Sequence, residues 1–223
     1  MFGRGLVADP AGFRLTTQSA ERVDALLAYV KQNAAAFTAR PGRIVFSGGW
    51  AGAAEGLGRP PRQFREGNLM LDRAMAADLG GVNLASYAGV YPEIESDSTL
   101  ENALRVKEDG YFDGIAFTAG NPLGLVAHRE HLARINYLVR KTFALPGDAT
   151  VGITAAGTDD RSGGIPESVL LPLTRLALLG AGNHRSLRRR HRVLVGFTHR
   201  LRTLPSAGRQ EPGNLERDAP GCS

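Results

Sequence analysis

The stretch Arg43-Ile44-Val45-Phe46-Ser47-Gly48-Gly49 decides how the rest of the chain is interpreted. Its apolar first half is typical of a short buried strand, and a serine and two glycines follow where that strand would end. In an open α/β sheet, ligands bind outside the carboxyl ends of the strands. We therefore expect Ser47, Gly48 and Gly49 to form a backbone cradle for a ligand, and an ordinary strand-to-loop turn is the alternative.

Helical and extended patterns alternate on both sides of this stretch. Apolar residues recur at helical spacing in several segments, and short apolar runs typical of strands lie between them. The expected helices cover residues 19–37, 66–79, 99–109, 127–143 and a last segment that opens at Pro166, and the expected strands cover residues 43–46, 82–87, 90–94, 114–118 and 150–154. This alternation predicts a Rossmann-like α/β fold, with a doubly wound, mainly parallel sheet and helices on both faces.

A second informative stretch, Glu93–Ala103, is densely polar just where a helix is expected to begin. Ser98 and Glu101 have the spacing of a capping box, in which each side chain binds a free N–H group at a helix start. Capping leaves four polar residues unexplained, and we expect them to bind a ligand: Glu93, Ser96, Thr99 and Asn102. Glu101 is a candidate for both roles, as a helix-capping residue and as a ligand-binding residue.

Carboxylates in these segments are candidates for a general base, if the protein carries out a reaction. The candidates are Glu93, Glu66 and Glu101, and Glu66 is also a candidate ligand-binding residue. Glu66 lies in the first turn of a predicted helix, where an acid also complements the helix dipole. The residue types name no reaction, so no catalytic residue is assigned.

Two further segments contribute candidate binding residues. Gly3 and Gly5 near the start of the chain can form a tight turn whose backbone closely approaches a ligand, and a plain loop is the alternative. His131 and Arg134 lie on the first turns of the helix expected over residues 127–143, where cations suit an anionic ligand. The alternative for this pair is a solvated helix face, with Arg134 bound to Glu130.

The basic character of the chain is confined to its last part. Residues 1–181 carry 18 Lys and Arg against 19 Asp and Glu, a balance of −1, whereas residues 182–223 carry 9 Arg against 3 acids, a balance of +6. We therefore expect one α/β domain over residues 1–181 and a basic, largely disordered tail over residues 182–223. The nearly neutral body gives no indication of a specific nucleic-acid partner.

Several classes of protein are excluded by composition. The only cysteine is Cys222, so the sequence predicts neither an internal disulfide framework nor a cysteine metal cluster, and no metal site is assigned. No apolar run approaches the length of a membrane-spanning helix, and the start of the chain lacks a signal-type pattern. The expected location is the cytoplasm.

Taken in order, these motifs resemble the YdcF/SanA/ElyC family, a YdcF-like domain of unknown function. The resemblance covers most of residues 1–145. It rests on the glycine turn, on Ser47-Gly48-Gly49, on Arg65-Glu66-Gly67 with Met70, on the residues from Glu93 to Ala103, and on His131-Leu132-Ala133-Arg134. The chain departs from the family pattern at Ser98, where an Asn is usual, and at Arg65, where a Ser is usual.

The resemblance implies a protein that binds a small anionic or nucleotide-like ligand at the carboxyl edge of its sheet. S-adenosylmethionine is a ligand proposed within the family, and the family is linked to cell-envelope metabolism. The family's first strand precedes the glycine turn, but only Met1 and Phe2 stand before Gly3. We therefore expect either a start upstream of Met1 or a fragment whose central strand is lost.

Two other functions are kept as alternatives. One is a transferase or hydrolase that acts on a phosphorylated or glycan-precursor substrate, with one of the candidate carboxylates as base. The other is an interaction protein whose Arg-rich tail contacts acidic surfaces.

Overall fold

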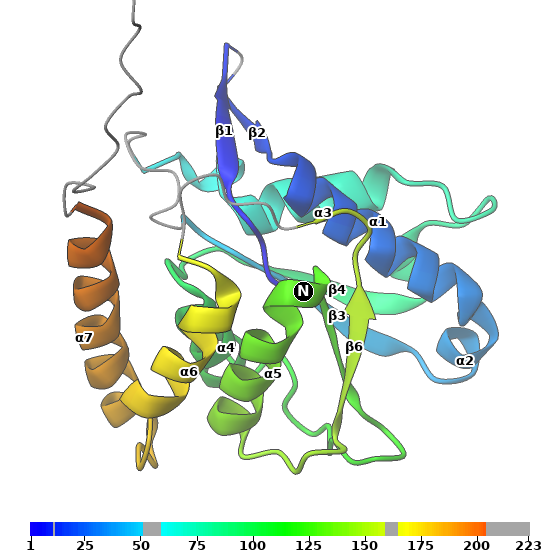
Figure 1. The fold of residues 1–223 in the computed structure, drawn as a ribbon. Coiled ribbons are helices and arrows are strands. Elements are labelled where there is room, and N and C mark those ends of the chain that lie inside the picture. Colours follow the sequence, from blue (N-terminus) through cyan, green and yellow to red (C-terminus); the bar gives the residue numbers. More distant parts are fainter. Residues whose placement is uncertain (11, 51–58, 159–164, 204–223) are drawn as a thin grey trace, which may run out of the picture.

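The computed structural model describes residues 1–10, 12–50, 59–158 and 165–203, and Figure 1 shows its course. Within these residues the chain has an α/β fold with short parallel sheets. The strands are β1 (Leu6–Asp9), β2 (Gly12–Leu15), β3 (Gly42–Ser47), β4 (Ala88–Glu93), β5 (Leu123–Ala127) and β6 (Thr150–Thr154). The helices are α1 (Thr17–Gln32), α2 (Ala34–Ala39), α3 (Glu66–Ala76), α4 (Thr99–Glu108), α5 (Arg129–Phe143), α6 (Glu167–Ala177) and α7 (His184–Thr203), with 3₁₀ turns at Arg62–Phe64 and Leu84–Ser86.

The strands pair two by two. β1 and β2 form an antiparallel hairpin, β3 pairs in parallel with β4, and β5 pairs in parallel with β6. Ser47 at the end of β3 lies opposite Glu93 at the end of β4, and Ala127 at the end of β5 lies opposite Thr154. Each parallel pair therefore presents its two carboxyl ends at one edge, where the sequence predicts the ligand site.

Helices cover both faces of the parallel pairs (Figure 1). α1 and α3 pack on one face through a cluster that includes Val23, Phe46 and Met70, all with 0% exposure. α4 and α5 cover the other face through a second cluster that includes Ala103 and Ile135. The apolar positions of these helices recur every three or four residues, as expected for helices that each bury one face.

The first three residues run beside β3. The Met1 amino group donates to the carbonyl of Val45 at 2.7 Å, the Ser47 N–H donates to the carbonyl of Met1, and the Gly3 N–H donates to the carbonyl of Ser47. Phe2 therefore forms a parallel bridge with Ser47, and its side chain packs into the cluster beneath α4 and α5.

Several predicted elements agree with the structure and others are wrong. β3, β6, α4 and most of α5 lie where the sequence places them. The strand expected at residues 82–87 is absent from this described segment, which holds the 3₁₀ turn Leu84–Ser86. The helix expected over residues 19–37 breaks at Asn33, between α1 and α2.

The strand expected at residues 114–118 is also wrong, and the strand that forms, β5, lies nine residues further on at Leu123–Ala127. Gly114 has a φ of 79°, which turns the chain out of an extended path. The Asn121 side chain then binds the carbonyl of Ala116, and Thr118 bridges to Asn121 in a tight turn. These local bonds compete with strand pairing for the same apolar segment.

The prediction of a largely disordered tail is wrong for its first half, because α7 spans His184–Thr203. Leu187 and Leu194 are buried, and Arg188 binds Glu101 and Glu108 of α4. The basic run is therefore a docked helix. Residues 204–223, including Cys222, lie outside the described residues, as do Asp159 and Asp160. Among the described helices, none has an apolar stretch long enough to span a membrane.

Candidate functional site

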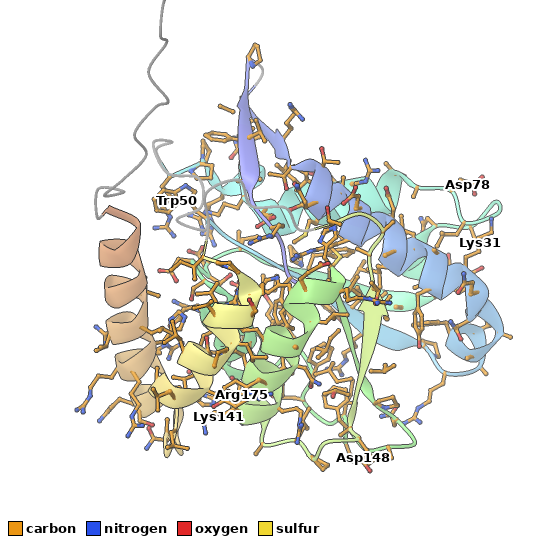
Figure 2. All side chains as sticks on the ribbon, in the orientation of Figure 1. Lys31, Trp50, Asp78, Lys141, Asp148 and Arg175 are labelled. Atoms are coloured by element: carbon orange, nitrogen blue, oxygen red, sulfur yellow. The ribbon has the colours of Figure 1, made fainter. Side chains whose placement is uncertain are left out.

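The candidate residues gather at the carboxyl ends of β3, β4 and β5 and at the amino ends of α3, α4 and α5. Ser47, Glu93 and Ala127 end the three strands, while Glu66 and Thr99 begin the helices α3 and α4. Figure 2 labels Lys141 and Arg175, which mark the opposite ends of α5 and α6, away from this edge. Helix amino ends carry partial positive charge, so their convergence favours anions here.

Glu93 and Ser96 hold the loop after β4 together. Glu93 is 1% exposed, and one carboxylate oxygen accepts hydrogen bonds from the hydroxyls of Ser47, at 2.5 Å, and Ser96, at 2.7 Å. The other oxygen accepts from the N–H groups of Glu95, at 2.8 Å, and Ser96, at 2.9 Å. Four donors thus satisfy the buried charge, and both side chains are engaged inside the protein.

The backbone cradle predicted at Ser47, Gly48 and Gly49 is occupied by carbonyl groups of the loop after β4. The Gly48 N–H donates to the carbonyl of Glu93, and the Gly49 N–H donates to the carbonyl of Ser96, both at 3.0 Å. A Cβ atom at Gly49 would clash with the Ser96 carbonyl, so glycine is required for this approach. In this conformation the cradle binds backbone rather than a ligand.

The glycine turn at Gly3 and Gly5 does bind an anion, but that anion is the carboxylate of Glu66. One oxygen of Glu66 accepts hydrogen bonds from the N–H groups of Arg4 and Gly5, the latter at 2.5 Å. The Ser19 hydroxyl donates to the same oxygen at 2.5 Å. Gly5 has a φ of 119°, and successive N–H groups in such a turn form an anion-binding concavity.

His131 and Arg134 lie together, as the sequence predicts, inside a chain of buried charges. The fully buried guanidinium of Arg22 lies 3.2 Å from Nδ1 of His131, and Arg134 lies 2.8 Å from Nε2. Arg22 also donates to Nδ1 of His128, whose Nε2 lies 2.8 Å from a carboxylate oxygen of Glu21.

The two guanidinium groups at His131 would need two acceptor nitrogens, and a neutral imidazole has one. A neutral imidazole has one acceptor nitrogen and one N–H donor, whereas a guanidinium only donates. Both ring nitrogens of His131 face a guanidinium, so only one contact is a hydrogen bond and the other sets two donors against each other. At His131 the two contacts therefore present one more donor than the ring can accept.

Burial and neighbouring charge both keep the ring of His131 neutral. Burial, and then the positive charges of Arg134 and Arg22, hold the pKa of His131 well below its ordinary value. The ring is therefore neutral at neutral pH, and its protonation would add a third cation to the cluster.

Glu167, at the start of α6, is the internal anion of this cluster. Its two oxygens accept from Arg134 at 2.7 and 2.9 Å, and one oxygen lies 3.9 Å from Nε2 of His131. The side chains of Arg134 and Glu167 are 11% and 13% exposed. A carboxylate of the chain thus stands where a ligand anion would bind, and the expected pairing of Arg134 with Glu130 is replaced by this pair.

α4 and α7 supply the remaining groups around Arg134. The Thr99 hydroxyl lies 3.5 Å from Nη1 of Arg134, and Asn102 lies on the same face of α4 three residues on. Asn102 is a buried polar residue with 7% exposure. Burial, and then the charge of Arg134, lower the pKa of His191 on α7, which adds a second neutral imidazole.

The carboxylate of Glu101 contacts α7 and not Arg134. The Ser98 hydroxyl accepts from the Glu101 N–H at 3.3 Å, which is one half of the predicted capping box. The Glu101 carboxylate binds Arg188 of α7 and lies 3.9 Å from Arg105. It thus docks α7 onto α4.

Sequence reasoning missed Arg22, Glu167 and His191. Arg22 carries a usable signal, because it lies one position before Val23 on the buried stripe of α1, where a cation needs a buried partner. Glu167 has only the ordinary signal of an acid in a first helical turn. In the parts of the chain that the structure describes, no group of three His, Cys, Asp or Glu side chains is placed to hold a metal ion.

No family model matches the chain, and neither a curated protein nor a solved structure matches it.

Proposed function

We propose that the protein binds a small anionic ligand, such as a phosphorylated or nucleotide-like molecule, between His131 and Arg134. The observation that carries this proposal is the donor surplus at His131, where two guanidinium groups face one neutral imidazole. An anion that accepts from Arg134 would replace the opposed donors with charge-assisted hydrogen bonds.

Three neighbouring features support the same ligand class. Glu167 already places a carboxylate on Arg134, which supports an anionic group as the ligand. The hydroxyl of Thr99 supplies a neutral hydrogen-bonding group beside it, and Asn102 is a buried polar residue of the same helix. The amino ends of α4 and α5 add the partial positive charge of their dipoles.

The resemblance to YdcF-like proteins extends this proposal. It would make the fold a doubly wound sheet and the ligand a nucleotide-like molecule such as S-adenosylmethionine, whose carboxylate suits Arg134. A cytoplasmic protein linked to cell-envelope metabolism belongs to the same proposal and rests on that resemblance alone.

The alternative of a transferase or hydrolase receives less support from the geometry. Each of the three carboxylates considered as a base is already bound: Glu93 to two serines and two N–H groups, Glu66 to the glycine turn, and Glu101 to Arg188. A general base has to reach the proton it removes, and in this conformation each of these carboxylates is engaged by groups of the protein.

Calorimetric titration with inorganic pyrophosphate tests the proposed site. The proposal predicts binding to the unmodified chain and at least about tenfold weaker binding to Arg134→Gln, since a charged hydrogen-bonded contact contributes about 1.5–3 kcal/mol. Arg129→Gln is the matched control, because Arg129 is an exposed cation on the first turn of the same helix. Equal affinity of all three proteins, each shown to be folded by its thermal transition, would rule out the site.

A further inference from the structure

A second cluster of charges lies where β4 ends and α3 begins. Three arginines, Arg59, Arg62 and Arg65, meet there at the carboxylate of Glu95. Arg62 and Arg65 bind one carboxylate oxygen, at 3.0 and 2.5 Å, and Arg59 binds the other oxygen at 2.9 Å. These four side chains, which we call the Glu95 cluster, therefore carry a net charge of +2.

The local sequence positions the three arginines. Arg62 opens the 3₁₀ turn that precedes α3, and its carbonyl accepts from the Arg65 N–H at 3.2 Å. Arg59 precedes Pro60 and Pro61, whose rings restrict the backbone angle φ, and Pro60 is buried. The turn and the prolines thus limit the freedom of the backbone that presents these side chains.

Arg65 and Glu95 form the inner part of the cluster. The Arg65 side chain is 9% exposed and also donates to the carbonyl of Ile94 at 3.2 Å. The Glu95 N–H donates to the buried carboxylate of Glu93, which fixes the loop that carries Glu95. Within the described residues, Nε of Arg65 is buried and makes no hydrogen bond. Buried donors in proteins nearly always have an acceptor, so this nitrogen favours an additional acceptor beside Glu95.

Arg59 and Arg62 form the outer part of the cluster. Their side chains are 58% and 72% exposed, so both guanidinium groups meet solvent beside their bonds to Glu95. A guanidinium has five N–H donors, whereas a carboxylate has two oxygens with about four acceptor positions. One carboxylate therefore cannot accept from all the donors of three guanidinium groups, and the outer arginines keep N–H groups for another acceptor.

The carboxylate of Glu95 stays ionised in this environment. Burial acts to raise its pKa, but the hydrogen bond from Arg65 and the charges of Arg65, Arg62 and Arg59 outweigh burial and hold the pKa below its ordinary value. Glu95 therefore orients the three guanidinium groups at neutral pH, while its single charge offsets only one of theirs.

We propose that the Glu95 cluster binds a phosphate monoester of a small molecule, with Arg59 and Arg62 as its direct contacts. At neutral pH such a group carries a charge of about −1.5 to −2 and three strong acceptor oxygens. Its charge matches that of the cluster, and arginine pairs with phosphate through two parallel hydrogen bonds. Glu95 is a positioning residue, and Arg65 adds positive charge behind the two contacts. The site shares no residue with the one between His131 and Arg134 and does not depend on it.

Nuclear magnetic resonance of the backbone amides during titration with phenyl phosphate tests the proposal at the site itself. At about pH 7.5, where the phosphate is mostly doubly charged, the N–H groups of Arg65 and Glu95 should shift in a saturable way in the unmodified chain. In the double variant Arg59→Gln, Arg62→Gln, the dissociation constant obtained from these two amides should rise at least about tenfold, since both lost contacts are charge-assisted hydrogen bonds. The two substituted residues are exposed, so the amide spectrum elsewhere should stay that of the folded chain.

Two control variants separate this site from other effects of charge. Arg73→Gln is the matched control, because Arg73 is an exposed arginine that binds both carboxylate oxygens of Asp24. Arg134→Gln removes the cation of the site beside His131. Each control should change the dissociation constant at the amides of Arg65 and Glu95 less than about twofold.

Four outcomes overturn the inference. Two of them are the absence of a saturable shift in the unmodified chain and an equal dissociation constant in the double variant. A third is equal affinity for phenyl sulfate, which has the same shape and a single charge, because the match depends on the second charge. The fourth is loss of the shifts in Arg134→Gln, which would assign the bound anion to the site beside His131.

Discussion

The ion pair between Arg134 and Glu167 offers the sharpest single perturbation, the substitution Glu167→Gln. The pair is bidentate at 2.7 and 2.9 Å, and its side chains are 11% and 13% exposed. The substitution keeps the size of the side chain and removes its charge. It therefore leaves Arg134 beside a neutral amide and next to the uncharged ring of His131. Arg22 contacts the other nitrogen of that ring.

The expected effects on stability and on binding have opposite signs. Loss of one partner from a mostly buried pair costs about 2–4 kcal/mol in the free energy of unfolding, because the remaining charge stays desolvated. The same change removes the internal carboxylate that competes for Arg134. We therefore expect the affinity for pyrophosphate to rise about tenfold or more, since a site freed of an internal competitor binds closer to its intrinsic affinity.

Chemical denaturation with and without pyrophosphate measures both effects. Glu130→Gln is the control, because Glu130 is an exposed acid in the first turn of α5 and reproduces the loss of a helix-dipole interaction without loss of an ion pair. Pyrophosphate should stabilise Glu167→Gln more than it stabilises the unmodified chain or the control. Equal or smaller stabilisation of Glu167→Gln would refute the idea that Glu167 occupies the ligand position.

Three further predictions concern the support of the fold. The pKa of the Met1 amino group is about 5 in the folded chain, against an ordinary value of 8.0 that applies to the unfolded chain. As pH falls below 8, the unfolded chain therefore binds a proton that the folded chain does not. The free energy of unfolding should fall as pH drops from 8 to 5, by at most about 1.4 kcal/mol per pH unit. Denaturation at several pH values should show this slope in the free chain and not after acetylation of its amino group, and equal slopes would contradict it. Arg188→Ala should destabilise the protein by about 1–2 kcal/mol, because Arg188 ties α7 to both Glu101 and Glu108, whereas the exposed Arg189→Ala should change stability by less than about 0.5 kcal/mol in the same denaturation assay. Glu93→Gln should cost about 3 kcal/mol, because an amide nitrogen would replace an acceptor of buried donors; a thermal transition unchanged from that of Glu130→Gln would show that the Glu93 network adds nothing.

Elements with complete local signals could be predicted from the sequence. α4 begins at Thr99 after the Ser98 cap, and β3 ends at Ser47 before its glycines, as their residue types indicate. β5 could not be placed, because the competing segment at residues 114–118 is equally apolar and only the positive φ at Gly114 and the Asn121 side chain exclude it. α7 could not be predicted to dock, since Glu101 and Glu108 lie 87 and 80 residues before their partner Arg188.

The candidate site shows the same limit. His131 and Arg134 lie one helical turn apart, so their proximity follows from spacing alone. The role of Glu66 could not be read from its position at a helix start, because the backbone N–H groups that it binds belong to Arg4 and Gly5. Polar residues at a strand end serve the loop or a ligand equally well, and only the four donors around Glu93 decide for the loop.

The imidazole of His131 reports most directly on whether an anion binds between Arg134 and His131. Its pKa is held well below the ordinary value by burial and then by Arg134 and Arg22. A bound anion would offset those charges, so nuclear magnetic resonance of the ring nitrogens should show that pyrophosphate raises the pKa of His131 in the unmodified chain and leaves it unchanged in Arg134→Gln. If the pKa and ring shifts of His131 stay the same in the unmodified chain at saturating pyrophosphate, the claim is contradicted.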